Sequence, residues 1–156
     1  MSKVEKLCAA SEAFADAIKG IPDERVKQLY DTFAGVRVFV AKVRTFVPKP
    51  TSSQIASGLE QGWRELPILI QGLPRQWRTM LSMAWSDATH KHYPEFCAKE
   101  HQVLQKILDR GKIRGEREYY RIRHEIDILE GESGERAALL TLYTLVNAYE
   151  RPGKSR

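Results

Sequence analysis

The sequence has few cysteines and no long apolar run, and both absences limit where the chain can work. Its two cysteines, Cys8 and Cys97, lie far apart. A chain of 156 residues, 42% of them hydrophobic, can bury a core without a disulfide framework. We therefore expect free thiols in a reducing compartment, and a single Cys8–Cys97 disulfide is the alternative. The N-terminal segment Met1–Lys6 carries mixed charge, and no apolar stretch approaches the roughly 20 residues of a membrane span. These features predict a soluble, cytoplasmic protein without a membrane segment.

The sequence also lacks the short motifs that mark common catalytic sites. It contains no glycine-rich phosphate loop, no Gly-x-Ser-x-Gly elbow and no His-Glu-x-x-His pair. Glu116 and Glu118 are two residues apart, which places them on different faces of a helix and makes them a poor carboxylate pair. We therefore expect a protein that is not an enzyme and uses no cofactor. A zinc-dependent enzyme ranks third among the functional hypotheses.

One group of imidazole and thiol side chains is the reason for keeping that third hypothesis. Cys97 and His101 are four residues apart and so share one face of a helix, as a metal pair would. His90 and His92 precede Pro94 and are near enough in sequence to complete a tetrahedral site. The spacing matches no zinc signature, however, and Cys97 also fits an apolar stripe. A buried cysteine in the core is therefore the favoured interpretation.

Strand patterns are equally scarce, because apolar residues recur at three- and four-residue spacing along the whole chain. Even the β-branched stretch Val36–Val40 fits a helix, because apart from Val38 the side chains around it separate onto two faces. One face holds Val36, Phe39, Val40, Val43, Phe46 and Val47, and the other holds Arg37, Ala41, Lys42, Arg44 and Thr45. Gly20 and Asp23 predict the end of a first helix and the N-cap of a second, which extends to Val47, and Gly111 is expected to end a later helix. Pro67 is expected to kink or end a later helix. We predict an all-α fold, an irregular bundle of six or seven helices.

Proline and serine mark the clearest connector in the chain. Two prolines end the second helix, and Ser52 or Ser53 is expected to cap the next one. The connector is short, which favours one domain over two. We predict a single helical domain over residues 1–151, which contains an N-terminal helical hairpin (1–47) and a proline-rich linker (48–53). A frayed basic tail follows at residues 152–156.

Acidic residues are absent over a long stretch, from Asp31 to Glu60. The net charge of +5 and the isoelectric point near 9.3 favour acidic partners, such as nucleic acid or an acidic protein face. A second basic region spans residues 110–123, with six basic and two acidic residues. Arg114, Arg117, Arg121 and, just beyond it, His124 follow three- and four-residue spacing and predict a basic stripe on one helix face. Arg117 and Arg121 are four apart, a repulsion that a purely structural helix has no reason to keep. An ordinary solvated face is the alternative, because acids four residues away partly neutralise the stripe.

The C-terminal third of the chain carries a resemblance to known proteins. Residues 110–120 read Arg-Gly-Lys-Ile-Arg-Gly-Glu-Arg-Glu-Tyr-Tyr and are followed by Leu-Glu-Gly at 129–131 and a closing helix. With these elements the chain resembles a C-terminal helical hairpin of small bacterial cytoplasmic proteins. Some of these are similar to immunity proteins, which neutralise a toxin encoded beside them by binding it. The resemblance implies a helical binding protein with a toxin as partner, and it transfers no functional residue.

These patterns together predict a non-enzymatic protein-binding module, most concretely an immunity protein that occludes a toxin. Arginine and tyrosine dominate interface energetics, and the partner of a basic surface should present an acidic or mixed face. The alternative is a helical nucleic-acid-binding protein whose basic stripe contacts phosphates. Heptad-like spacing in the second helix also permits a homodimer. The expected partner-binding residues are Arg114, Arg117, Tyr120, Arg121 and His124 near the C-terminus, with Arg37, Lys42 and Arg44 on the second helix.

Overall fold

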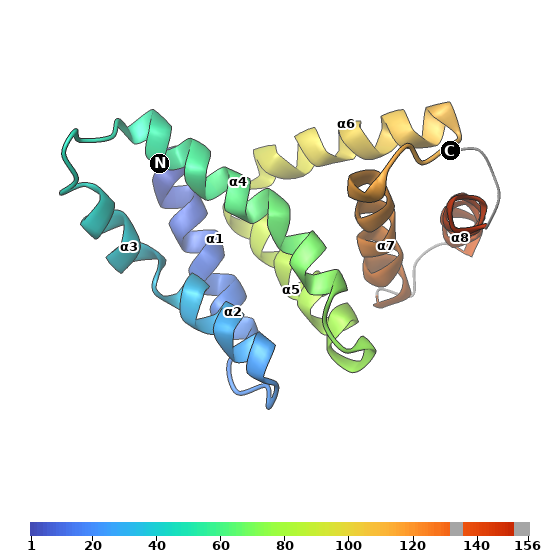
Figure 1. Cartoon of the computed structure of the whole chain (residues 1–156), viewed down its shortest axis with the longest axis horizontal. Coiled ribbons are helices and arrows are strands. Elements are labelled where there is room, and N and C mark those ends of the chain that lie inside the picture. Colours follow the sequence, from blue (N-terminus) through green and yellow to red (C-terminus); the bar gives the residue numbers. More distant parts are fainter. Residues whose placement is uncertain (132–135, 152–156) are drawn as a thin grey trace. The chain divides into compact units, whose positions relative to one another are not determined.

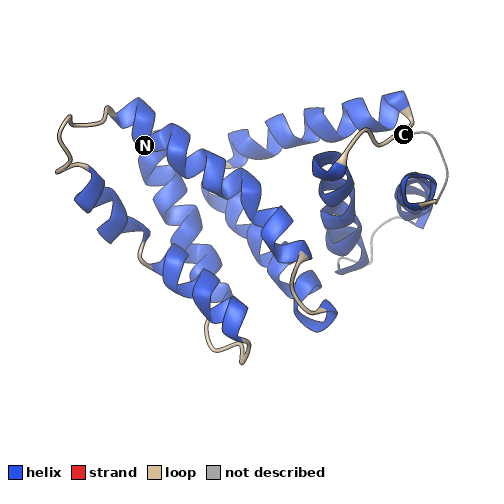
Figure 2. Ribbon diagram, in the orientation of Figure 1, coloured by secondary structure: helices blue, strands red, loops and turns tan. Residues whose placement is uncertain are grey.

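The computed structural model describes residues 1–131 and 136–151, and the predicted tail at 152–156 lies outside these ranges. Every regular element in the described residues is an α-helix (Figures 1 and 2), which confirms the predicted all-α class. No helix within these ranges is both long and apolar enough to cross a membrane. The described residues form eight helices: α1 (Lys3–Ile18), α2 (Glu24–Ala34), α3 (Val36–Val43), α4 (Ser52–Gln71), α5 (Arg75–His92), α6 (Pro94–Arg110), α7 (Glu116–Gly131) and α8 (Arg136–Glu150).

The predicted second helix is in fact two helices, which explains why the described residues form eight helices rather than six or seven. A single helix over residues 24–47 is therefore wrong. At Gly35 the backbone has φ −88° and ψ 13°, outside helical geometry, and its N–H donates to the carbonyl oxygen of Asp31 at 3.2 Å. Glycine destabilises a helix interior because it has more backbone freedom to lose. The stretch Val36–Val40 is helical, as predicted.

Several predicted helix ends are confirmed. The carboxylate of Asp23 accepts hydrogen bonds from the N–H groups of Arg25 and Val26, so Asp23 is the N-cap of α2. Gly20 and Gly111 follow α1 and α6 with φ of +86° and +73°. At these two turns glycine accepts a left-handed backbone without the strain that a Cβ would add.

The structure corrects one prediction about α4 and narrows a second. Its N-cap is Thr51 rather than Ser52 or Ser53. The Thr51 Oγ1 accepts from the N–H of Gln54 at 3.1 Å, and the Gln54 Oε1 accepts from the N–H of Thr51 at 2.8 Å. This reciprocal pair provides hydrogen-bond acceptors for two backbone N–H groups that have no partner within the helix. The sequence predicts that Pro67 kinks or ends this helix. It does not end α4, which continues to Gln71, and the kink stays a prediction.

The chain packs as two compact units. Unit 1 consists of Met1–Leu66 and Asp87–Pro94, and unit 2 consists of Pro67–Ser86 and Glu95–Arg156. α4 and α5 each contribute to both units, so the division falls within these helices and not at the proline-rich linker. The single domain over residues 1–151 stays a prediction.

The core of unit 1 involves α1, α2 and α4. The rings of Phe14, Phe33 and Trp63 pack edge to face. The Phe14 centroid lies 5.5 Å from that of Phe33 and 6.1 Å from that of Trp63, and the Phe33 and Trp63 centroids are 5.9 Å apart. The Trp63 Nε1–H donates to the Thr89 hydroxyl at 3.0 Å, which joins the end of α5 to this core. α1 buries the whole face that its periodicity predicts. Its buried residues are Val4, Leu7, Cys8, Ala10, Ser11, Phe14, Ala15 and Ile18.

The core of unit 2 involves α5, α6, α7 and α8. α7 packs on α8, and the ring of Trp85 on α5 meets that of Phe96 edge-on at 5.8 Å. The apolar faces predicted for α6, α7 and α8 supply most of the buried side chains of this core, and burying these side chains stabilises unit 2. One cluster of buried residues is Leu104, Ile107, Ile113, Ile122, Ile126, Leu142, Leu145 and Val146.

Candidate functional site

The basic stripe predicted on α7 is exposed only toward its N-terminal end. Arg114, just before the helix, and Arg117 are exposed. Tyr120 is half-buried, and its ring meets that of Tyr119 edge-on at 5.4 Å. Tyr119 in turn stacks on Tyr149 of α8 at 5.2 Å. This aromatic contact holds the first turns of α7 against α8 beside the two exposed arginines.

Arg121 lies inside unit 2 rather than on an open stripe. Its side chain is 14% exposed and lies between two carboxylates, with its Nε 3.2 Å from Glu100 and its Nη1 3.5 Å from Glu125. Its Nη2 also donates to the carbonyl oxygen of Glu100 at 3.4 Å. The predicted repulsion with Arg117 is therefore offset locally by two acids. The surface position predicted for Arg121 is wrong, because α6 covers this face of α7.

His124 is fully buried, so its predicted place on a surface stripe is also wrong. Its ring meets that of Trp85 edge-on at 4.9 Å. Within the described residues neither ring nitrogen has a hydrogen-bond partner. Burial, followed by the nearby charge of Arg121, lowers the pKa of His124 to about 3. The imidazole is therefore neutral at physiological pH and belongs to the core.

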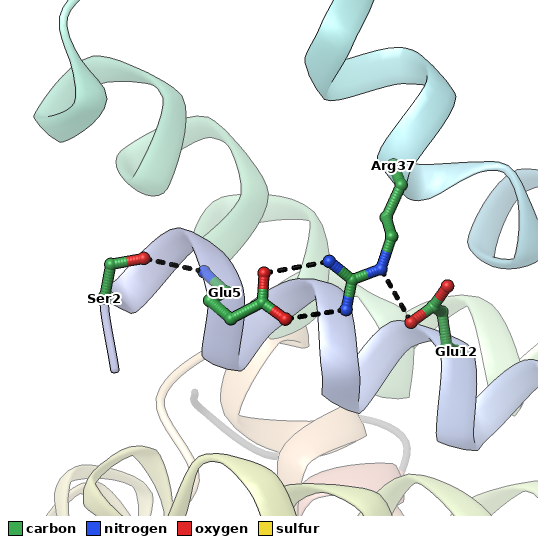
Figure 3. Close-up of polar contacts among 4 residues, drawn as sticks. All are labelled: Ser2, Glu5, Glu12 and Arg37. Atoms are coloured by element: carbon green, nitrogen blue, oxygen red, sulfur yellow. Dashed lines mark hydrogen bonds and ion pairs between the residues drawn. The ribbon is translucent and has the colours of Figure 1, made fainter.

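The first basic residue predicted on α3, Arg37, is held by the protein itself. Figure 3 shows its guanidinium between two carboxylates of α1. Its Nη1 and Nη2 each donate to Glu5 at 2.8 Å, and its Nε donates to Glu12 at 2.9 Å. These bonds lower the pKa of Glu5, mainly through the hydrogen bonds from Arg37. Arg37 thus links α3 to α1, and its guanidinium is already paired with two carboxylates.

The rest of α3 and the turn after it present exposed apolar side chains beside exposed cations. Val38, Phe39, Phe46 and Val47 are 76%, 56%, 50% and 96% exposed. The predicted helix face that contained Phe39, Phe46 and Val47 is therefore only partly covered. Val36 and Val40 are buried in unit 1. We call the exposed set the α3 surface, and it consists of Val38, Phe39, Lys42, Arg44, Phe46 and Val47.

A pocket of about 300 Å³ opens beside the α3 surface, where α1 and α4 begin. Figure 1 shows the two helix starts side by side, with the chain from α3 returning to them. Two of the residues that line the pocket are cationic and four carry hydroxyl groups. Sequence reasoning did not find this pocket, because its residues come from three segments whose proximity depends on the tertiary fold. The α1–α4 pocket is lined by Ser2, Lys3, Val4, Arg44, Ser52, Ser53, Ala56 and Ser57.

The four candidate metal ligands are not gathered into a metal site. In the part of the chain that is described, no group of three or more His, Cys, Asp or Glu side chains is arranged to hold a metal ion. His90 and His92 lie in the last turn of α5 and belong to unit 1, whereas Cys97 and His101 lie on α6 in unit 2. Burial raises the pKa of the Cys97 thiol, which disfavours the thiolate that binds metals.

The predicted partner-binding residues thus divide into three groups. Arg114, Arg117, Lys42 and Arg44 are exposed, Tyr120 is half-buried, and Arg37, Arg121 and His124 are held by contacts within their own units. The exposed cations of α3 lie in unit 1 and those near the start of α7 lie in unit 2. No known protein family, curated protein or solved structure matches the chain.

Proposed function

We propose that this chain is a non-enzymatic protein-binding module that contacts its partner through the α3 surface. The observation that carries the proposal is the density of exposed apolar groups. Four large apolar side chains are half or more exposed within residues 38–47. Scattered exposed apolar residues are ordinary, but a close group beside polar residues is typical of an interaction site.

The contacts beneath the α3 surface support a preformed binding face. Val36 and Val40 are buried together with Val4, Cys8, Ile55 and Ala56, and Arg37 forms hydrogen bonds to two carboxylates of α1. A helix fixed in this way loses little conformational freedom when a partner binds. The exposed side chains therefore form a surface whose geometry is set before binding.

Charge defines the chemistry of the partner. Lys42 and Arg44 lie among the exposed apolar residues, Lys49 follows them, and no acidic residue occurs between Asp31 and Glu60. Electrostatic complementarity favours a partner whose contacting face is apolar with acidic groups around it. The resemblance of the C-terminal third gives this proposal its most specific form, an immunity protein whose partner is a toxin with such a face. Arg114, Arg117 and Tyr120 are then candidates for a second contact.

Nucleic-acid binding has less support from the described residues. Trp63 and Trp85 are buried and so are not platforms for stacking bases. Two members of the predicted basic stripe, Arg121 and His124, are inside unit 2. The exposed apolar side chains of the α3 surface also have no role in phosphate contacts.

The proposal is tested by capture with matched variants. Tagged wild-type chain and the double variant Phe39→Ser/Phe46→Ser are used to recover proteins from nuclease-treated host lysate at low and high salt, and the recovered protein is then purified and titrated. Leu140→Ser is the control, because Leu140 is as exposed as Phe39 but lies on α8. We expect direct binding that the double variant weakens by about tenfold or more and the control leaves unchanged.

Two results contradict the proposal. One is a purified partner that binds the wild type and the double variant equally. The other is a bound species that disappears with nuclease or that weakens steeply as salt rises, which indicates phosphate contacts.

A further inference from the structure

We propose that the α1–α4 pocket binds a phosphate group. This goes beyond the proposed function, because it uses none of the apolar side chains of the α3 surface. The inference starts from the residues that line the cavity, which include Lys3, Arg44 and four serines and no acidic residue. One of these serines, Ser2, accepts a hydrogen bond from the Glu5 N–H as the N-cap of α1 and keeps its hydroxyl proton to donate. Residues that carry hydroxyl and cationic donors around one cavity suit an oxyanion.

Arg44, the one residue that the pocket shares with the α3 surface, supplies a guanidinium to the pocket. Arg44 is exposed, and among the described residues its guanidinium has no hydrogen bond or ion pair, while its backbone N–H donates to the carbonyl oxygen of Val40 at 3.1 Å. It follows the last residue of α3 as the C-cap of that helix, so its backbone position is fixed. Arginine binds phosphate through parallel N–H donors, which gives geometry as well as charge.

Lys3 supplies the second cation from the first turn of α1. Its Nζ lies 3.4 Å from Glu60, and the Lys3 side chain is 44% exposed. Glu60 is not part of the lining and also accepts a hydrogen bond from Tyr93 and one from Arg64. The Glu60 carboxylate thus keeps other donors if the Lys3 ammonium turns toward an anion.

The backbone adds further hydrogen-bond donors at the N-terminus of α4. The capping pair of Thr51 and Gln54 uses the N–H groups of those two residues. In the described chain the N–H groups of Ser52 and Ser53 have no hydrogen-bond partner, and both residues line the pocket. The positive end of the α4 dipole adds to the charge of Arg44 and Lys3.

The number of donors favours phosphate over a carboxylate. A carboxylate has two oxygens, whereas a phosphate monoester presents three and carries up to two charges. The volume of about 300 Å³ lies at the small end of ligand pockets, large enough for a phosphate with a small group attached. The occupant is therefore a phosphate carried by a small molecule or by the headgroup of a phospholipid.

The test is a titration of the full chain with inorganic phosphate at constant ionic strength, followed by amide NMR shifts. We expect saturable shifts at Ser52, Ser53, Ala56 and Ser57. Arg44→Gln should weaken binding by about tenfold or more, since it removes charge-assisted hydrogen bonds. Arg114→Gln is the matched control, because it removes an exposed arginine of unit 2, and Phe39→Ser/Phe46→Ser should also leave phosphate binding unchanged.

A parallel arm with phosphatidylcholine vesicles, with and without phosphatidic acid, distinguishes the two sources of phosphate. Binding that requires phosphatidic acid and is lost in Arg44→Gln supports the pocket with a lipid headgroup as its ligand. Shifts with free phosphate alone support it with a soluble ligand. The proposal is overturned if neither probe binds, if Arg44→Gln binds as well as the wild type, or if Arg114→Gln weakens binding equally.

Discussion

His124 shows how one buried side chain can give the whole fold a pH dependence. The neutral imidazole is fully buried against Trp85, and its pKa is lowered to about 3 from an ordinary value of 6.5. Protonation in the folded state is therefore much less favourable than in the unfolded chain. The contribution of His124 to stability is complete above pH 6.5 and is lost as the pH falls from there toward 3.

The corresponding prediction compares the wild type with His124→Leu by urea unfolding. Between about pH 7 and about pH 5, the free energy of unfolding should fall by about 2 kcal/mol more in the wild type, since one pKa unit is worth about 1.4 kcal/mol. The variant should fold, because leucine replaces a buried polar ring that has no hydrogen bond. His101→Gln, at an exposed position, is the control. Equal pH dependence in wild type and His124→Leu would contradict the prediction.

Arg37 gives a second prediction at the residue scale. In Arg37→Gln the pKa of Glu5 should rise toward its ordinary value of 4.5, because the hydrogen bonds from the guanidinium are the main cause of its lowered pKa. NMR titration of the carboxyl group measures this directly. The melting temperature should also fall, and by less at high salt, since these are exposed ion pairs.

Lys42→Gln is the control for Arg37, since it removes an exposed charge from the same helix. An unchanged pKa of Glu5 in Arg37→Gln would contradict the observed pairing. The wild-type pair stabilises the fold above pH 4.5, and this contribution is lost as the pH falls below that value.

At the scale of the helix, two glycines are predicted to respond to alanine in opposite directions. A Cβ at Gly131, the last residue of α7, would meet the Met83 Sδ and lie 2.9 Å from the Thr79 Cγ2. Gly131→Ala should therefore destabilise unit 2, by about 1 kcal/mol or more, because packed side chains must shift. Gly62 lies within α4 with nothing within 4 Å of an added Cβ. Gly62→Ala should stabilise the chain by about 0.5–1 kcal/mol through helix propensity.

Urea unfolding of both glycine variants and of the wild type measures the change in the free energy of unfolding, and so whether each variant is stabilised or destabilised. Gly58→Ala repeats the open case elsewhere on α4, since its added Cβ also meets nothing within 4 Å. A stabilised Gly131→Ala would mean that α7 does not approach Met83 this closely.

Local sequence signals explain most of the helices, and the exceptions have identifiable causes. The periodicity of residues 3–18 predicts the residues that α1 buries except Ala10, and Asp23 and Gly111 begin and end helices as expected. The break at Gly35 was missed because the apolar spacing continues across it. Thr51 was missed as a cap because Ser52 and Ser53 are equally good capping types, and only the path of the chain decides among them.

At the scale of the whole molecule, the two units share helices, which predicts that they unfold together. α4 crosses from unit 1 to unit 2 at Leu66–Pro67, and α5 crosses back at Ser86–Asp87. Unfolding one unit alone would break both helices in their interiors, where hydrogen bonds are cooperative. Hydrogen exchange in increasing denaturant should therefore show the slowest amides of α1 and α7 opening with one free energy. Separate openings in the two units would contradict the predicted single domain.

The sequence by itself determined the helical class, the buried face of helices such as α1 and the excess of positive charge, because spacing and composition act locally. It did not determine which basic side chains are held by contacts within the fold. Arg37 pairs with Glu5 and Glu12 of α1, and Arg121 pairs with Glu100 of α6 as well as with Glu125 on its own helix. His124 is buried against Trp85 of α5. The tertiary structure alone decided that Arg44 and the serines of α4 meet Lys3 in one pocket. A side chain's exposure depends on what packs over it, and that is set by contacts between segments distant in the chain.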